Sequence, residues 1–256
     1  MRYINNDIGS FYSSEDVVSS VLRFCDLIRG YPQILKPIRG MDDEVERVSS
    51  ENGFKLYPTV KKTTLLNNGN FFFKILHPIT IKDRLRFLLT NRAEGIFKLS
   101  EVLRKHGISI VEVVAYGTLR IGRKPLYVMN KVTGRSLYDA LIKDRETVGF
   151  NVLEAVIDEV ARMHKLGYWF GDAHLSHIFI DESGVTGLID IDGIRRNDSF
   201  NIKRMARDIA GLNHTSIPIT SDEKVQLLGR YMDRLGIKER DWFLRLIKIY
   251  IKKRWG

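Results

Sequence analysis

The sequence predicts an α+β protein with a strand-rich first part and a mainly helical second part. Between residues 54 and 133, short apolar runs alternate with turn signals around one helical segment. After residue 134, apolar residues recur mostly at helical spacing, as in "NVLEAVIDEVARMHKLG". Strands grouped apart from helices are typical of the α+β class. The chain has 256 residues, enough for one large domain or two lobes, and we place the lobe boundary near 133–136.

The composition indicates a folded protein with an anionic partner. Hydrophobic residues make up 44% of the chain, which is enough for a core, and the single cysteine excludes an internal disulfide and favours the cytoplasm. No apolar run of about 18 residues occurs, and the N-terminus lacks the apolar segment of a signal peptide. The net charge is +10, and residues 223–256 hold ten Lys/Arg against four Asp/Glu. Nucleic acid, an acidic membrane surface and a phosphorylated substrate all fit such a charge.

Residues 1–53 are predicted to form an N-terminal helical extension. The stretch "SSEDVVSSVLRFCDLIRG" begins like a capping box, carries an apolar stripe and ends at Gly30. The charged residues 31–53 are interpreted as a loop.

Residues 54–133 are predicted to form a small lobe of antiparallel strands with one helix. Strands are predicted in "FKLYPTV", "TTLL" and "NNGNFFFKIL", and "NNGN" is typical of a hairpin turn. A helix is expected over 84–106, where "KHG" ends it. Two further strands are expected in "ISIVEVVAYGTLRIG" and "KPLYVMNKVTG".

Residues 134–256 are predicted to form the helical lobe. "SLYDALIK" indicates a short helix, and a longer one over 151–167 places its apolar residues at i, i+3, i+4 and i+7. The last segment, "DWFLRLIKIYIKKRWG", has two open interpretations: a packed final helix with a basic tail, or a helix that lies on an anionic membrane surface.

One hairpin of this lobe brings two carboxylates together. The apolar runs "HIFI" and "GLIDI" flank the turn "DESGVTG", with Asp172 just before the first strand and Asp190 at the end of the second. A carboxylate between apolar residues favours a cationic partner, and Mg²⁺ with a phosphate is the usual one. One base and one metal ligand are the minimum that phosphoryl transfer needs.

These motifs resemble those of the protein-kinase-like superfamily, from about residue 54 to 212. "GDAHLSHIFI" is similar to its catalytic loop, and "LIDIDG", with Asp190 18 residues after Asp172, to its metal-binding segment. The resemblance implies a two-lobed fold that binds ATP in its cleft. It implies that Lys74 in "FFFKIL" holds the α- and β-phosphates, that Glu94 orients this lysine, and that the backbone of Asn130 and Val132 in "LYVMNKVTG" pairs with adenine.

The details most resemble bacterial lipopolysaccharide core kinases, which phosphorylate heptose or Kdo. His177 stands where most of the superfamily has Asn, as in loops of that group, and "RMARDIAGL" resembles another of its elements. The resemblance implies that Asp172 accepts the hydroxyl proton, that Asp190 and His177 are the metal ligands, and that Asp208 braces the catalytic loop. The metal would be Mg²⁺ or, alternatively, Mn²⁺, although imidazole is a poor magnesium ligand.

The chain also departs from the superfamily in the segment expected to cover the phosphates. It has no glycine-rich loop, and only "PTVKKTT" is available as a turn over the phosphates, with Lys61, Lys62, Thr63 and Thr64 as candidate contacts.

The sequence therefore predicts an ATP-dependent kinase for a lipopolysaccharide core sugar. Its expected partners are a nucleotide and an anionic glycolipid or sugar acceptor, in the cytoplasm, with peripheral contact to the inner membrane surface. Two alternatives stay open: a kinase for another substrate (a protein, a ribosome-associated target or a small molecule), and a nucleotide-binding pseudokinase scaffold. A nucleic-acid partner is not expected, because the basic residues lack interleaved aromatic side chains.

Overall fold

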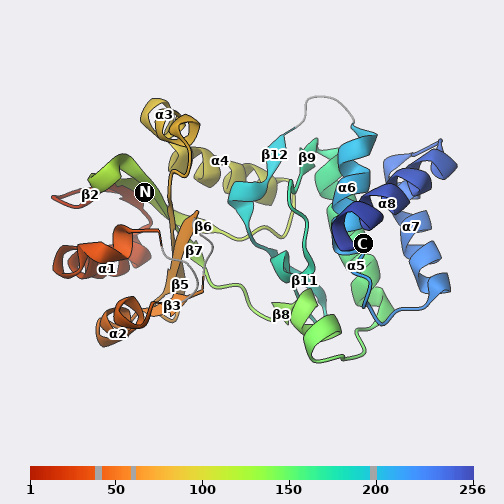
Figure 1. The fold of residues 1–256 in the computed structure, drawn as a ribbon, viewed down its shortest axis with the longest axis horizontal. Helices are drawn as coiled ribbons and strands as arrows, with labels where there is room; N and C mark the ends of the chain where they lie inside the picture. Colours follow the sequence, from red (N-terminus) through yellow and green to blue (C-terminus); the bar gives the residue numbers. More distant parts are fainter. Residues whose placement is uncertain (38–41, 59–61, 197–200) are drawn as a thin grey trace. The chain divides into compact units, whose positions relative to one another are not determined.

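The computed structural model describes residues 1–37, 42–58, 62–196 and 201–256. It divides into two compact units (Figure 1). Unit 1 comprises residues 1–102 and 112–131, and unit 2 comprises residues 103–111 and 132–256. The predicted α+β architecture is confirmed, since an antiparallel sheet dominates one unit and helices dominate the other.

Unit 1 is built on a seven-stranded antiparallel sheet in the order β1-β2-β6-β7-β5-β4-β3. The strands are β1 (Arg2–Asn5), β2 (Gly9–Ser13), β3 (Lys55–Tyr57), β4 (Thr63–Asn67), β5 (Phe71–Leu76), β6 (Val113–Leu119) and β7 (Lys124–Asn130). The β4–β5 hairpin confirms the turn predicted at "NNGN". Asn68 closes that turn, because its Oδ1 accepts the Phe71 N–H at 2.9 Å.

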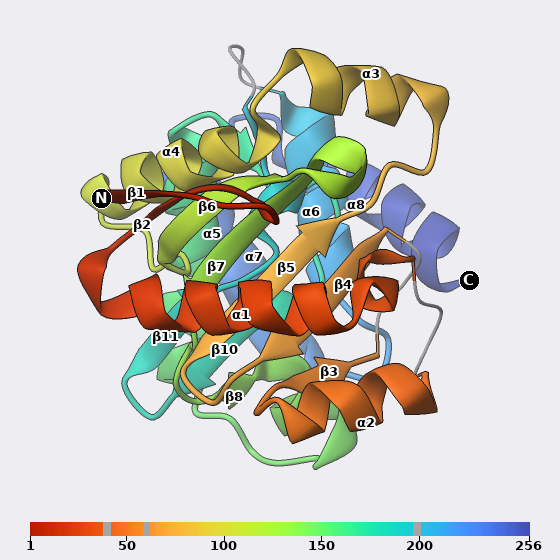
Figure 2. The same cartoon turned by 90° about the vertical axis from the view of Figure 1, so that its left-hand side faces the viewer.

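Two helices, α1 (Val18–Gly30) and α2 (Asp43–Glu51), cover one face of this sheet (Figures 1 and 2). The core between them is apolar: Phe24 stacks on Phe73 with ring centroids 4.7 Å apart, and both side chains are fully buried. The extension 1–53 is therefore not only helical, because β1 and β2 join the sheet through β6. The prediction of a loop over residues 31–53 is wrong in part, because α2 lies within this segment. Asp42 caps α2 there by accepting the Val45 N–H at 3.1 Å.

The single helix predicted over 84–106 is two helices, α3 (Ile81–Leu89) and α4 (Arg92–Lys105). A capping box between Thr80 and Asp83 starts α3. The backbone turns extended at Thr90, and the Asn91 side chain accepts the Glu94 N–H at 3.2 Å to begin the next helix. Short polar residues compete with helical hydrogen bonds in this way, which explains the break.

Unit 2 consists of helices around two small sheets. Its helices are α5 (Phe150–Lys165), α6 (Ile202–Leu212), α7 (Ser221–Leu235) and α8 (Arg240–Trp255). The hairpin of β10 (Ile178–Asp181) and β11 (Gly184–Leu188) confirms the predicted one and pairs with β8 (Arg135–Ser136). A second, two-stranded sheet joins β9 (Tyr168–Trp169) and β12 (Arg195–Arg196). The "SLYDALIK" helix is a short π-helical turn at Asp139–Lys143.

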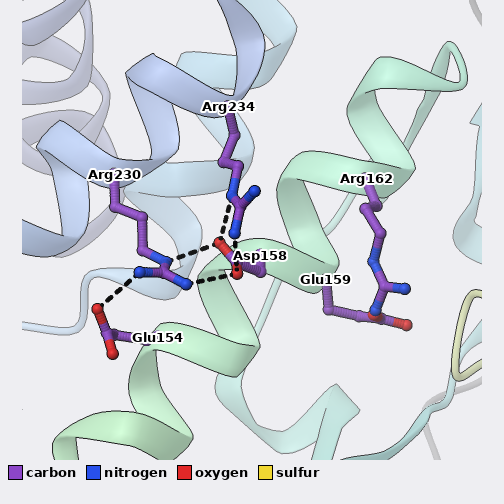
Figure 3. A network of polar contacts seen from close by, with 6 residues as sticks. All are labelled: Glu154, Asp158, Glu159, Arg162, Arg230 and Arg234. Atoms are coloured by element: carbon purple, nitrogen blue, oxygen red, sulfur yellow. Dashed lines mark hydrogen bonds and ion pairs between the residues drawn. The ribbon is translucent and has the colours of Figure 1, made fainter.

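A charged network holds α5 against α7 (Figure 3). The Asp158 carboxylate is gripped by Arg230 and Arg234, with Nη2–Oδ2 distances of 2.7 and 2.8 Å, and Arg230 also bonds Glu154. These hydrogen bonds lower the pKa of Asp158 to about 2. On another face of α5, the buried Glu159 accepts the Ser109 N–H, which ties residues 103–111 to unit 2.

In the described part of the chain, no helix is long and apolar enough to cross a bilayer.

Candidate active site

Asp172 lies on an exposed loop of unit 2, between β9 and the short 3₁₀ turn Leu175–His177. Its side chain is 73% exposed, and its Oδ1 is 2.9 Å from Nη2 of Arg254 near the end of α8. The preceding Gly171 has a φ of +79°, and a Cβ there would lie 2.8 Å from the Gly193 carbonyl oxygen. The loop therefore presents a carboxylate to solvent while its backbone packs against the segment that follows Asp190.

A series of buried, hydrogen-bonded side chains anchors this loop to the helices of unit 2. Asp208 Oδ2, on α6, accepts the Phe170 N–H at 2.7 Å and lies 3.1 Å from His164 Nε2. His164 Nδ1 lies 2.5 Å from the Tyr231 hydroxyl. Burial raises the pKa of Tyr231, so this hydroxyl stays protonated. The Asp208 carboxylate can only accept, so Nε2 of His164 carries the hydrogen in that contact, and Nδ1 can accept from the Tyr231 hydroxyl. The predicted bracing by Asp208 is confirmed.

Asp190 follows β11 in the left-handed conformation, with a φ of +63°. Its backbone carbonyl accepts the Gly193 N–H at 2.9 Å, and its Oδ2 would be 2.8 Å from a Cβ at Gly193. The adjacent Ile189 N–H donates to the His177 carbonyl at 2.8 Å, which ties this segment to the loop that carries Asp172. Asp172 and Asp190 thus come from one locally cross-linked piece of backbone, as the hairpin pattern predicts.

The predicted metal ligand His177 belongs to a cluster of rings. Its ring centroid is 5.8 Å from that of His174, which in turn is 5.5 Å from Tyr138 and 6.2 Å from Trp255. Burial lowers the pKa of His174, and the neighbouring His177 and Arg254 lower it further, so the cluster favours a neutral His174. These tilted ring contacts are a packing arrangement, and the ligation by His177 stays a prediction.

Among the described residues, no group of three or more His, Cys, Asp or Glu side chains could hold a metal ion. Magnesium at nucleotide sites needs only one or two carboxylates, since phosphate oxygens and water supply the remaining ligands. The half-buried Asp190 carboxylate, which lies against a glycine, fits that requirement.

In unit 1, the two residues predicted to hold the phosphates lie on β5 and α4. Lys74 is half-buried on β5, and its Nζ is 5.9 Å from the Tyr127 ring centroid. The Glu94 carboxylate contacts Lys98 Nζ at 2.6 Å and the Asn91 amide at 3.1 Å. The predicted pairing of Glu94 with Lys74 stays a prediction.

The segment expected to meet adenine lies at the end of β7. The Asn130 N–H donates to the Glu112 carbonyl at 3.0 Å, and the Lys131 N–H donates to the Asn70 carbonyl at 3.0 Å. The Asn130 N–H is therefore not available to a nucleotide. In the described part of the chain, the Val132 N–H donates to no protein acceptor, so it is the better candidate of the two predicted residues.

The prediction that the "PTVKKTT" segment forms a turn over the phosphates is wrong in part. Thr63 and Thr64 belong to β4, and the fully buried Thr64 hydroxyl lies 2.8 Å from His77 Nε2. Burial lowers the pKa of His77 to about 4, with a smaller contribution from Lys124, so this pair is a neutral part of the core. Thr64 cannot contact a phosphate from there. Lys62 is exposed beside the strand, and Lys61 lies outside the described residues.

Comparison with solved structures supports the kinase-like architecture. The chain is 18% identical to the bifunctional kinase-methyltransferase WbdD, with a TM-score of 0.51, over 75% of this chain and 43% of that one. It is 16% identical to an aminoglycoside-3'-phosphotransferase of type VIII, with a TM-score of 0.52, over 82% of this chain and 98% of the other. An aminoglycoside phosphotransferase from Streptomyces rimosus in complex with ADP and streptomycin is 15% identical, with a TM-score of 0.50, over 78% and 93% of the two chains.

These likenesses show the fold, and the chain spans less than half the length of the WbdD structure. None of the curated proteins compared with the chain matches it. A family model gives the closer relationship. The model of the lipopolysaccharide kinase (Kdo/WaaP) family matches residues 54–250, which include β3 to β7 and nearly all of unit 2. The chain belongs to the lipopolysaccharide kinase (Kdo/WaaP) family, whose members are phosphotransferases.

Proposed function

We propose that the protein transfers the γ-phosphate of ATP to a hydroxyl of a lipopolysaccharide core sugar, heptose or Kdo. The observation that carries this proposal is the exposed Asp172 carboxylate on a loop anchored by the buried Asp208–His164–Tyr231 chain. A rigid loop that presents one solvent-accessible carboxylate suits a group that must meet an incoming hydroxyl. The family match supports a sugar acceptor.

Each predicted residue has a distinct part in this reaction. Asp172 would accept or orient the proton of the attacking hydroxyl. Lys74 would neutralise the α- and β-phosphates, and Glu94 would orient it. Asp190 would hold the divalent metal, Mg²⁺ or Mn²⁺, which when bound neutralises charge on the transferring phosphoryl group. The protein's own contribution is positioning and electrostatics.

The alternative of a pseudokinase scaffold has one observation in its favour. Glu94 accepts from Lys98 and Asn91 in this structure. A protein in which Glu94 kept only these partners and did not orient Lys74 would bind a nucleotide without turnover. We place the reaction at the cytoplasmic face of the inner membrane, where a core acceptor and ATP would meet.

Two carboxamide variants and one matched control test the proposal. Asp172→Asn should lower kcat about 10²- to 10⁴-fold and leave ATP binding intact, because a general base acts in the transition state. Asp190→Asn should weaken Mg²⁺-dependent ATP binding as well as turnover. Asp181→Asn is the control, since this exposed carboxylate lies at the tip of the same hairpin.

The readouts are phosphate transfer to a deacylated core oligosaccharide and equilibrium binding of ATP with and without Mg²⁺. Turnover that survives in Asp172→Asn would refute the assigned base. ATP binding by the wild type without any transfer would favour the scaffold.

A further inference from the structure

A hollow lined by cations lies in unit 2, beside the catalytic loop, and the reaction described above leaves it unused. Its volume is about 470 Å³. The lining residues come from α6 and α8 and are Lys203, Arg204, Arg207, Tyr250, Lys253 and Arg254. Five of these six side chains are cationic and none is acidic, so the hollow has the charge of an anion site.

Helix periodicity explains how the cations converge. Lys203 and Arg207 are four residues apart on α6, and Tyr250 and Arg254 are four apart on α8, so each pair shares one face of its helix. The two helices pack against each other. In the described part of the chain, Lys203, Arg207 and Lys253 form no ion pair with a carboxylate. Within the described residues no carboxylate offsets the repulsion among these three cations, which favours a ligand of opposite charge.

Arg254 connects this hollow to the proposed base. Its guanidinium lines the hollow, lies 2.9 Å from Asp172 Oδ1 and sits 5.2 Å from the Trp255 ring centroid. A guanidinium has five N–H donors in a fixed plane, so one side can hold Asp172 while another meets an anion. An anion in the hollow would lie one side chain away from the group that receives the hydroxyl proton.

We propose that the hollow binds an anionic substituent of the sugar acceptor, a phosphate or a carboxylate, and that Arg254 positions it relative to Asp172. This inference rests on the proposed function. It restricts the acceptor to sugars that carry such a group close to the hydroxyl that is phosphorylated. It also disfavours polycationic acceptors, such as the aminoglycosides of the structurally similar enzymes, because the five cations would repel them.

The experiment compares two double variants with equal loss of charge. Lys203→Gln with Lys253→Gln removes two exposed cations of the hollow, and Lys248→Gln with Lys252→Gln removes two exposed cations of α8 outside it. The ligands are a deacylated core oligosaccharide with its phosphate and carboxylate groups intact, and the same glycan after dephosphorylation and carboxyl reduction. Titration calorimetry gives Kd for each combination, without any need for turnover.

The hollow variant should bind the intact glycan about five- to thirtyfold more weakly than the wild type, as expected for two exposed charge contacts. The control variant should bind it like the wild type, and the neutralised glycan should not distinguish the proteins. Equal weakening in both variants, or no weakening, would overturn the proposal, as would an intact glycan that does not bind the wild type. A glycan that binds through the hollow but is never phosphorylated would instead refute the proposed function alone.

A second, independent observation concerns α3. None of its residues is buried, and its large apolar side chains are exposed: Ile81 by 76%, Leu85 by 52%, Leu88 by 51% and Leu89 by 82%. These four stand at i, i+4, i+7 and i+8, which places them on one face of the helix. Three cations, Lys82, Arg84 and Arg86, lie on the same short helix.

An apolar face flanked by cations matches the chemistry of an anionic lipid surface. The apolar side chains can enter the boundary between headgroups and acyl chains, and the cations can meet the lipid phosphates. A water-soluble protein rarely exposes so many large apolar residues on one helix without a partner. We infer that α3 docks the protein on an anionic membrane, and this face replaces the last helix as the expected contact. In α8, Phe243 and Ile247 are buried in unit 2.

The test uses sedimentation with vesicles of phosphatidylglycerol and phosphatidylcholine. Leu85→Ser with Leu88→Ser should lower the partition coefficient about tenfold or more, since two side chains lose apolar burial. The control, Leu22→Ser with Val225→Ser, changes two residues that are 42% and 68% exposed elsewhere, and it should bind like the wild type. Transfer to a soluble oligosaccharide should be the same in all three proteins.

Vesicle binding that is unchanged in the α3 variant, or absent in the wild type, would overturn this inference. So would self-association of the wild type that the same two substitutions abolish, because a second copy would then cover the face.

Discussion

The substitution Asp208→Ala tests whether the buried chain under the catalytic loop matters for both stability and turnover. Asp208 is 1% exposed, and its carboxylate accepts the Phe170 N–H and the His164 ring N–H. Removing it leaves two buried donors without an acceptor. Each unsatisfied donor costs about 1–3 kcal/mol, so we expect unit 2 to lose about 2–6 kcal/mol of unfolding free energy.

Two milder variants should lose less unfolding free energy than Asp208→Ala. Tyr231→Phe removes only the hydroxyl bonded to His164 and keeps the ring stacked on Phe243, so it should cost about 1 kcal/mol. Asp208→Asn keeps one oxygen for the Phe170 N–H. However, Oδ1 of Asp208 has no hydrogen-bond partner in the described structure, so an amide group there would gain a buried donor without an acceptor. We expect its cost to fall between the other two.

The assay is urea unfolding followed by tryptophan fluorescence. All three tryptophans, Trp169, Trp242 and Trp255, belong to unit 2, so the signal reports on that unit. Turnover is measured in parallel. Because Phe170 precedes Asp172 by two residues, Asp208→Ala should lower kcat and leave the KM for ATP nearly unchanged. A loss below about 1 kcal/mol together with wild-type turnover would refute the reasoning.

Three other substitutions have outcomes that the structure predicts. Asp158→Asn should lower the free energy of unfolding most above about pH 4, and the difference from the wild type should disappear as the pH falls towards 2. The reason is that the native pKa of Asp158, about 2, lies below the ordinary value of 3.8. A difference in unfolding free energy that does not change with pH would contradict this. Gly211→Ala places a Cβ 2.4 Å from the Ala173 carbonyl oxygen, so urea unfolding should show a loss of about 1–3 kcal/mol, accompanied by a lower kcat. Gly193→Ala brings a Cβ within 2.8 Å of Asp190 Oδ2 and should weaken Mg²⁺-dependent ATP binding more than it lowers stability, which titration with and without Mg²⁺ can decide.

Local signals in the sequence predict the elements that local chemistry controls. The "NNGN" hairpin is confirmed, and so is the helix predicted over 151–167, which is α5 (Phe150–Lys165), because turn residues and apolar spacing act within a few residues of each other. The break between α3 and α4 is not predicted. Its signal is only the dipeptide Thr90–Asn91, in which a side chain caps the second helix.

Contacts between distant parts of the chain cannot be predicted from local patterns in the sequence. Thr64 belongs to a polar stretch, yet it is buried against His77, because the pairing of β4 with β5 turns its side chain inward. Side chains alternate between the two faces of a strand, so either set could face the core. The elements that pack against the strand decide which set does. The pairing of Arg254 with Asp172 has no local signal at all, since α8 reaches the catalytic loop only after α6 and α8 have packed together.

By itself, the sequence determined the α+β class and the hairpin that carries Asp172 and Asp190, since both depend on residues at short range, whereas the bracing by Asp208 was predicted from the resemblance of a motif. Tertiary structure alone decided that β1 and β2 complete the sheet and that cations of α6 and α8 surround one hollow. The reason is physical: hydrogen bonding within a turn or helix is specified by neighbouring residues, whereas the burial and pairing of a charged side chain depend on whichever element packs against it.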